Sequence, residues 1–363
     1  ASGGKVAEGE IIKYMVGREI EDRFPKRPHV QLGDVLMEVK DWTVHHPLYP
    51  ERKVVDGVNM VVRKGEVVGI SGLMGAGRTE LAMSLFGHSY GTGISGQLNY
   101  VADMPDLKVL AVSNTIVSTE ELSLIAQLKN LERLTLSSCS LTSLTPLAAM
   151  KDLLYLDVSG NTIRNLEPIS SMKKLEALNL QRNAVNDLSA LSGNQALLIL
   201  DVSYNSLSDL SVAFGLSNLQ WLNAKYNSVS SVSGISKLSK LAYFDISNNS
   251  ISDVTPLAGC TQLEYLNVAS NSISDIQSLS ALVNMTDFVF SHNNVTKLPS
   301  WKRSCQLQNI YGDHNDIRSL SPLAGLMRLN CVYMDYNPKL SDVNVLKDCQ
   351  VLFRVDVFGT KVK

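Results

Sequence analysis

A glycine-rich stretch near the start of the chain has the residue types and spacing of a phosphate-binding loop. Residues 69–87 read GISGLMGAGRTELAMSLFG and fit the pattern G-x-x-x-x-G-K-[ST], except that Arg78 replaces the lysine. Glycines allow backbone N–H groups to approach phosphate oxygens, and the N-terminus of a helix favours negative charge. The spacing therefore favours binding of nucleotide phosphates. The candidate residues are Gly72, Gly75, Gly77, Arg78 and Thr79.

The segments on either side of this loop are of the kind needed to position it. EVVGIS, residues 66–71, is an apolar run typical of a buried strand, and TELAMSLF, residues 79–86, reads as a helix. Such loops hold phosphate when they connect a strand to the start of a helix. We therefore expect a strand to end just before the loop and a helix to follow it.

The sequence around the loop resembles a family of ATP-driven transporters. Residues 35–72, VLMEVKDWTVHHPLYPERKVVDGVNMVVRKGEVVGISG, resemble the first strands of an ATP-binding-cassette domain. GLMGAGRTEL is characteristic of the second cassette of the tandem sugar-importer ATPases, and residues 10–27 resemble the linker that precedes it. The resemblance covers residues 10–99 and implies that Tyr49 stacks on adenine while the phosphates lie against residues 72–79.

The remaining parts of the hydrolytic machinery are missing from the sequence. Residues 100–363 contain no glutamine loop, no LSGGQ-like signature, no strand that ends in a metal-holding Asp and no switch histidine. Hydrolysis needs an acidic group to hold Mg²⁺ and a group to orient water. We therefore expect no enzymatic activity and no cofactor, and we interpret the loop as vestigial. The alternative is a nucleotide-binding fragment of a carbohydrate transporter, which binds ATP and Mg²⁺ weakly without hydrolysis.

Beyond residue 100 the chain repeats with a period of 22 residues. Each copy follows L-x-x-L-x-L-x-x-N-x-L, as in LEYLNVASNSI, residues 263–273, and weaker copies begin at Leu107, Leu131 and Leu352. Leu at alternate positions makes a short strand whose apolar face is buried only when copies stack. The Asn of each copy is expected to be buried and to bond backbone groups at the turn. These ladder residues are Asn161, Asn183, Asn205, Asn227, Asn249, Asn271, Asn293, Asn315 and Asn337.

This period predicts an α/β-type solenoid of leucine-rich repeats. The repeat length, together with ISDVTPLAGC and IRSLSPLAGL, resembles the internalin-like repeats of bacteria over residues 105–363. The resemblance implies a curved array that binds a protein partner on its concave face. We predict a right-handed superhelix of about 11–12 repeats with one parallel sheet on that face. The predicted units are a partial cassette over residues 1–100 and a solenoid over 101–363.

The joining of these two units needs its own explanation. We interpret it as a gene fusion, a misassembled sequence or a designed chimera, because neither family is expected to combine with the other in this way. The cassette fragment keeps apolar strands without their sheet partners, and the first repeat has an open edge. Docking of the fragment on the first repeats, as an N-terminal cap, is expected to cover both.

Residues between the strand leucines predict a binding surface, because they point away from the leucine core. Asp157, Asp201 and Asp245 match the repeat consensus, so we interpret them as ordinary repeat positions. The departures from consensus include rigid aromatic side chains, which protein-binding surfaces favour. The candidate partner-binding residues are Trp221, Lys225, Tyr226, Tyr243, Tyr265, Tyr311, Asp313, Tyr333, Asp335 and Tyr336.

Two histidines share one position of successive repeats. The Cα atoms of His292 and His314 are therefore expected ~5 Å apart. Asp313 and Asp335 are close in sequence, so the four residues could form a weak metal site or a pH-sensitive patch. Paired surface histidines without a function are far commoner, and we predict no metal site.

Composition narrows the choice of partners and compartment. The net charge of −2 does not favour nucleic acid, no run of eighteen apolar residues could span a membrane, and a monomer is expected. The start, ASGGKVAEGE, is unlike a signal peptide and as written points to the cytoplasm, although repeats of this type are often secreted or on the cell surface. All five cysteines are expected to be unpaired, with Cys331 alone facing outward.

Overall fold

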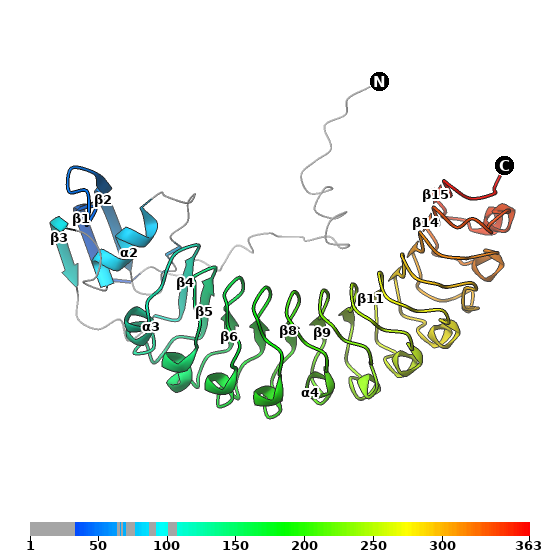
Figure 1. Ribbon diagram of the computed structural model, residues 1–363, viewed down its shortest axis with the longest axis horizontal. Helices are drawn as coiled ribbons and strands as arrows, with labels where there is room; N and C mark the ends of the chain where they lie inside the picture. The colour runs from blue at the N-terminus through cyan, green and yellow to red at the C-terminus, as the bar shows by residue number, and fades with distance from the viewer. Residues whose placement is uncertain (1–32, 64–65, 67, 70–76, 87–91, 101–106) are drawn as a thin grey trace, which may run out of the picture.

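Two units of different architecture follow one another along the chain (Figure 1). The computed structural model describes residues 33–63, 66, 68–69, 77–86, 92–100 and 107–363. A small sheet packed on one helix comes first, and a curved solenoid follows. Within these described ranges, no helix is long and apolar enough to cross a membrane.

The small unit is a three-stranded antiparallel sheet in the order β2-β1-β3. Side chains at alternate positions of β1, including Met37 and Val39, are buried against Leu81 and Leu85 of α2. The Trp42 indole Nε1 donates a hydrogen bond of 2.8 Å to Ser84 Oγ and so ties β1 to the helix. The elements are β1 (Val35–His45), β2 (Lys53–Arg63), α2 (Arg78–Phe86) and β3 (Thr92–Tyr100). The helix expected after the glycine-rich loop is therefore confirmed.

The strand expected at residues 66–71 is reduced, among the described residues, to a single bridge. Gly69 pairs in parallel with Ala111 of β4 (Val109–Ser113), which belongs to the solenoid. Helix α2 also lies against α3 (Thr119–Ile125) of the first repeat. Because the later strands of a cassette are missing from the sequence, this segment pairs with the open edge of the repeat sheet. The predicted docking of the fragment on the first repeats is confirmed.

The solenoid contains a twelve-stranded parallel sheet in which every strand pairs with its neighbours in the chain. The predicted count and the single sheet are confirmed, and Figure 1 shows the strands along the inner side of the arc. After β4 the strands are β5 (Arg133–Ser137), β6 (Tyr155–Asp157), β7 (Ala177–Asn179), β8 (Ile199–Asp201), β9 (Trp221–Asn223), β10 (Tyr243–Asp245), β11 (Tyr265–Asn267), β12 (Asp287–Val289), β13 (Asn309–Tyr311), β14 (Cys331–Tyr333) and β15 (Arg354–Asp356).

Short helical turns return the chain along the outer, convex side (Figure 1). Proline lies at the first positions of η1, η2, η5 and η7, where its fixed φ suits the turn and its missing N–H costs nothing. The turns are η1 (Thr145–Ala149), η2 (Glu167–Ile169), η3 (Ser189–Leu191), α4 (Ser211–Phe214), η4 (Ile235–Lys237), η5 (Thr255–Gly259), η6 (Gln277–Ala281), η7 (Ser321–Leu323) and η8 (Asn344–Asp348).

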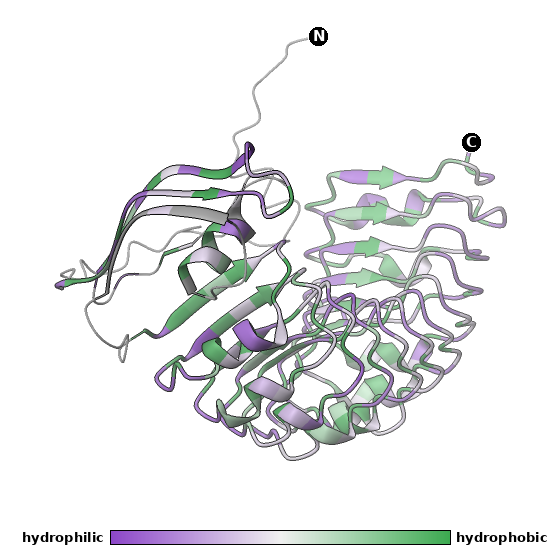
Figure 2. Ribbon diagram, turned by 60° about the vertical axis from the view of Figure 1, so that its left-hand side comes forward, coloured by the Kyte–Doolittle hydropathy of each residue, from purple (hydrophilic) through white to green (hydrophobic). Residues whose placement is uncertain are grey.

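One continuous apolar core runs through the stack, and Figure 2 shows apolar residues recurring from strand to strand. Leucines fill most of it, while Phe288, Phe290 and Trp301 fill the space near the C-terminal repeats. All five cysteines are free thiols, of which four are buried and Cys331 is half-buried on the strand face. The predicted unpaired state and the outward position of Cys331 are confirmed.

The ladder asparagines bond the backbone of two successive repeats. The Asn227 amide Nδ2 donates to the carbonyls of Val202 and Ala224, both at 3.0 Å. Its Oδ1 accepts from the Leu207 N–H at 2.9 Å. The predicted bonding is therefore confirmed. The expected burial is right for Asn161, Asn293, Asn315 and Asn337 but wrong for the five central ladder residues, which are half-buried. Their inner atoms reach the backbone groups while the rest of each residue stays in contact with solvent.

Candidate functional site

A stack of three aromatic rings crosses the concave face on β9, β10 and β11. The ring centroids of Trp221 and Tyr243 lie 4.7 Å apart and those of Tyr243 and Tyr265 lie 4.5 Å apart. The parallel register places these residues directly opposite one another, so their rings align. All three are half-buried. Burial raises the pKa of Tyr265 to about 12 and also raises the pKa of Tyr243.

A second stack lies on β13 and β14, two positions further along the strand. Tyr311 and Tyr333 have ring centroids 4.7 Å apart and planes within 6° of each other. The guanidinium carbon of Arg354 lies 5.3 Å from the Tyr333 ring centroid. Burial raises the pKa of Tyr311 to about 12. The five concave aromatic residues predicted from the sequence therefore form two separate stacks.

The central aspartates of the same face serve the repeat itself. Asp201 Oδ1 accepts from the N–H and the hydroxyl of Ser203 at 2.9 and 2.6 Å. Its Oδ2 accepts from Asn223 Nδ2 at 3.0 Å, and the Asn267 amide meets Asp245 in the same way at 3.3 Å. Burial raises the pKa of Asp201 and Asp245, while hydrogen bonds from Ser203 and Ser247 lower it. This supports their interpretation as repeat positions.

A further row of rings lies just past the strands, at the residue that precedes each ladder Asn. This residue has a positive φ in every repeat from Asn114 to Gly359, although glycine and asparagine are the types that adopt it most readily. The candidates Tyr226 and Tyr336 lie in this row and are exposed. Tyr226 stacks on Tyr204 with centroids 4.4 Å apart.

Sequence reasoning missed one ring of this row, that of Tyr204. Tyr204 carries the Arg182 guanidinium at 5.1 Å and the Lys225 ammonium at 5.8 Å from its ring centroid. It also missed Phe358, which directly precedes the row position Gly359 and packs edge-on against Tyr336 with ring centroids 5.5 Å apart. The signal available in the sequence was the residue type directly before each ladder Asn.

The two histidines belong to the same row. His292 and His314 stack with ring centroids 4.2 Å apart, and His314 stacks on Tyr336 at 4.4 Å. Asp313 accepts from the Asp335 N–H at 2.9 Å, and Asp335 accepts from the Phe358 N–H at 2.6 Å. Both carboxylates therefore support the backbone between repeats. Across the described part of the chain, no group of three or more His, Cys, Asp or Glu is arranged to hold a metal ion.

Three residues of the predicted phosphate site lie at the start of α2 in the small unit. Gly77 has φ +73°, and a Cβ there would lie 2.1 Å from the Val54 carbonyl oxygen, so only glycine fits. The Leu81 N–H bonds the Gly77 carbonyl at 2.8 Å, which begins α2. Arg78 and Thr79 form the first turn of α2. Gly72 and Gly75 lie outside the described residues.

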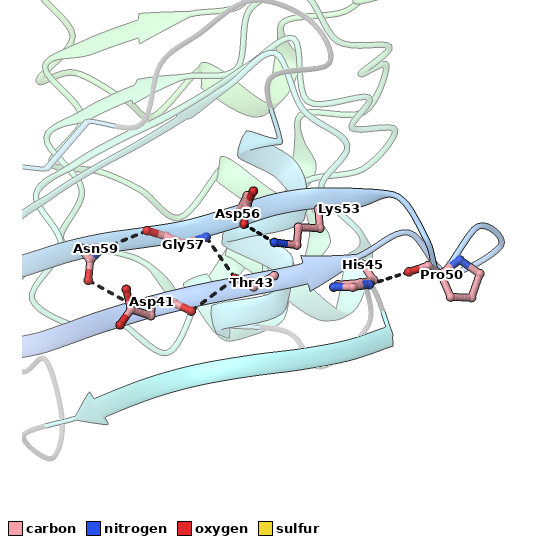
Figure 3. A network of polar contacts seen from close by, with 8 residues as sticks. All are labelled: Asp41, Thr43, His45, Pro50, Lys53, Asp56, Gly57 and Asn59. Carbon is pink, nitrogen blue, oxygen red and sulfur yellow. Dashed lines mark hydrogen bonds and ion pairs between the residues drawn. The ribbon is translucent and has the colours of Figure 1, made fainter.

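Tyr49 lies in the turn between β1 and β2. Its side chain is 57% exposed, and its ring centroid is 5.2 Å from that of His46. Figure 3 shows the polar contacts of this hairpin, among them the bond of His45 Nδ1 to the Pro50 carbonyl at 2.5 Å and the pair of Lys53 with Asp56 at 2.8 Å. These contacts fix the turn and leave the Tyr49 ring accessible.

Comparisons with known proteins identify both units. A family model described as leucine-rich repeats (2 copies) matches residues 129–171 and 217–259. An internalin (inlF) from Listeria monocytogenes superposes with a TM-score of 0.53 at 21% identity, over 77% of this chain and 94% of that one. Internalin C2 from the same species gives 0.50 at 29% identity, over 57% and 89%. The functional domain of InlJ gives 0.57 at 20%, over 78% and 69%. The fold of the repeats is that of an internalin-like solenoid.

The other similarity is to sugar transporters. The L-arabinose transport ATP-binding protein AraG of Geobacillus stearothermophilus is 58% identical over 94 residues, which are 26% of this chain and 18% of that protein. The xylose import ATP-binding protein XylG of Thermoanaerobacter pseudethanolicus is 51% identical over 80 residues, 22% of this chain and 16% of that protein. The chain thus spans less than a fifth of the length of these relatives.

Proposed function

We propose that the solenoid binds a protein partner on its concave face, over residues 219–337. The observation that carries this proposal is the pair of aromatic stacks, Trp221–Tyr243–Tyr265 and Tyr311–Tyr333, on adjoining strands. Half-buried Trp and Tyr side chains offer large contact area and lose little conformational entropy on binding. The leucine-rich-repeat fold, which supports protein interaction in general, adds to this.

The proposal competes with a simpler explanation, in which the rings serve only as good strand formers. The distribution of the rings favours binding. The outward positions of β7 and β8 hold Ala177 and Ile199 instead, so the fold does not require aromatic residues there. We also propose that the solenoid does not bind nucleic acid, because Asp201, Asp245, Asp287, Asp313 and Asp335 on this face repel phosphates. The monomer expected from the sequence remains part of the proposal.

Selection of a displayed peptide library on the immobilised full chain tests the proposal. Replacing Trp221, Tyr311 and Tyr333 together with Ala is expected to weaken the selected binders by about 2 kcal/mol or more. Tyr155→Ala is the matched control, since Tyr155 occupies the same repeat position as Trp221 but packs with Arg133 outside the proposed region. Unchanged affinity in a folded triple variant would show that the partner binds elsewhere.

For the small unit we propose a capping role without ATP hydrolysis. The sequence lacks the metal-holding acid and the switch histidine, and Gly69 is engaged with the solenoid at β4. The runner-up, weak nucleotide binding, draws support from the accessible Tyr49 ring and from the glycine at the start of α2.

A titration with a fluorescent ATP analogue distinguishes these two hypotheses for the small unit. Tyr49→Ala is the suitable variant, because any side chain at Gly77 collides with Val54 and would disturb the fold. No saturation up to millimolar analogue supports the capping role alone. Saturable, Mg²⁺-dependent binding that Tyr49→Ala abolishes would establish the runner-up.

A further inference from the structure

We propose that the partner presents a positively charged segment to the concave face, and that an Arg or Lys side chain of that segment sits over Asp287 against the ring of Tyr265. This inference rests on the proposed function and adds the chemistry of the partner. It follows from the charge of the face, from the order of side chains along one row, and from the way the solenoid itself pairs cations with rings.

The concave face over β8 to β14 carries mostly negative charge. We count the outward side chains of these strands and the two residues directly before each ladder Asn. Lys225 is the one Lys or Arg at those described positions. A face of this sign attracts a basic segment and speeds its encounter with the protein. The acidic residues there are Asp201, Asp245, Asp287, Asp313 and Asp335.

Lys225 balances only one end of this acidic row. It lies close enough to Asp201 and Asp245 to lower the pKa of both carboxyls, against the larger effect of burial, which raises it. Asp287 has neutral partners instead: its carboxylate accepts from Asn309 Nδ2 at 2.8 Å and from Thr286 Oγ1 at 2.7 Å. The negative charge of Asp287 is thus held by neutral groups and is open to neutralisation by a partner. Asp313 and Asp335 also accept from backbone N–H groups, but of these three carboxylates Asp287 is the one that lies directly opposite Tyr265.

Asp287 also lies at the point on the concave face where the long aromatic side chains of β9 to β11 give way to shorter ones. The register places it opposite Tyr265 on one side and opposite Asn309 on the other. An Asp side chain is too short to cover the outer part of a tyrosine ring, so the face of Tyr265 that points toward Asp287 is left for a ligand. Tyr311 lies close by on β13: after burial and Tyr333, the charge of Asp287 is the next cause that raises its pKa.

The solenoid uses cations on ring faces at three other places. Arg133 lies 4.2 Å from the centroid of Tyr155, and Arg354 lies 5.3 Å from that of Tyr333. In both cases the cation comes from a neighbouring repeat, as Arg182 does for Tyr204 at 5.1 Å. At Tyr265 the neighbouring repeat supplies Asp287 instead. A cation from the partner would complete the same arrangement and gain an ion pair beneath it.

The test begins with random peptides displayed on phage and selected on the immobilised full chain. We expect the enriched peptides to contain more Arg and Lys than the unselected library. Asp287→Asn is expected to weaken the strongest synthetic peptide about tenfold or more, because it removes the charge and keeps the shape. The matched control is Asp152→Asn, which changes net charge equally at an exposed pair with Lys174 away from this face.

A second variant covers the case in which Asp287→Asn disturbs the strand. Asn309→Lys places a cation beside Asp287, and we expect it to reduce binding of the cationic peptide to a similar degree while thermal unfolding stays unchanged. Enriched peptides without excess Arg or Lys would overturn the inference. So would binding of the cationic peptide to both variants as tightly as to the unchanged protein. If such peptides still depend on Trp221, Tyr311 and Tyr333, the proposed function stands. If no peptide is enriched, both fail.

Discussion

The small unit and the solenoid cover their apolar strands in different ways. In the solenoid each strand finds its partner one repeat further along the chain, and the core runs unbroken through all twelve strands. In the small unit eight buried residues form a core between β1, β2 and α2, and Gly69 pairs with β4 of the solenoid. A repeat array is stable without distant segments, because its strands pair with neighbours in the chain. A piece of a larger sheet needs a substitute strand to pair with.

The largest expected effect separates the two cores. Phe288→Ala should lower the free energy of unfolding of the solenoid by about 3–5 kcal/mol, because the ring is fully buried against Phe290 and Trp301. Met37→Ala in the small unit should shift the same transition by less than about 1 kcal/mol. Urea unfolding followed by circular dichroism measures both. Equal shifts would show that the two units unfold as one.

A smaller loss is expected from the ladder. Asn227→Ala should cost about 1–3 kcal/mol, because it removes three donated bonds and one accepted bond and leaves the backbone groups of neighbouring repeats unsatisfied. The same unfolding measurement applies. A change indistinguishable from zero would mean that the half-buried ladder residues are solvated well enough to be dispensable.

Glycine substitutions in the row of residues with positive φ are expected to stabilise the solenoid. Ser270→Gly should stabilise the solenoid by about 0.5–1 kcal/mol, because glycine adopts φ +54° without steric cost. Tyr226→Gly should gain less, since it also loses the stack on Tyr204. If both changes stabilise equally, the rings of this row contribute nothing to folding.

The smallest expected effect is on the reactivity of the thiols and leaves stability unchanged. All five thiols belong to the solenoid. Burial raises the pKa of Cys139 and Cys260 to about 11, so both stay protonated and unreactive at pH 8. We expect iodoacetamide to label Cys331 first in the native protein, as it is the least buried thiol. Mass spectrometry of the labelled peptides gives the order, and early labelling of Cys260 would indicate local opening of the core.

Much of the solenoid could be predicted because its determinants are local and recur. The leucine period specifies strand positions and register, and with them the concave places of Trp221 and Tyr311. The row that contains Tyr204 could not be read in this way, since its stacking depends on a backbone φ that the leucine pattern does not report. Gly69 pairs with Ala111 because the cassette fragment lacks its own sheet partners. No repeat period in the sequence indicates this pairing.

We propose that the concave aromatic stacks, and not the small unit, hold the partner. Hydroxyl-radical footprinting of the full chain, with and without a selected peptide, tests it on the side chains themselves. We expect oxidation of Trp221, Tyr265 and Tyr311 to slow in the complex. The oxidation of Tyr49 and Tyr155 should not change. Protection of Tyr49 with unchanged rates at the concave rings would contradict it.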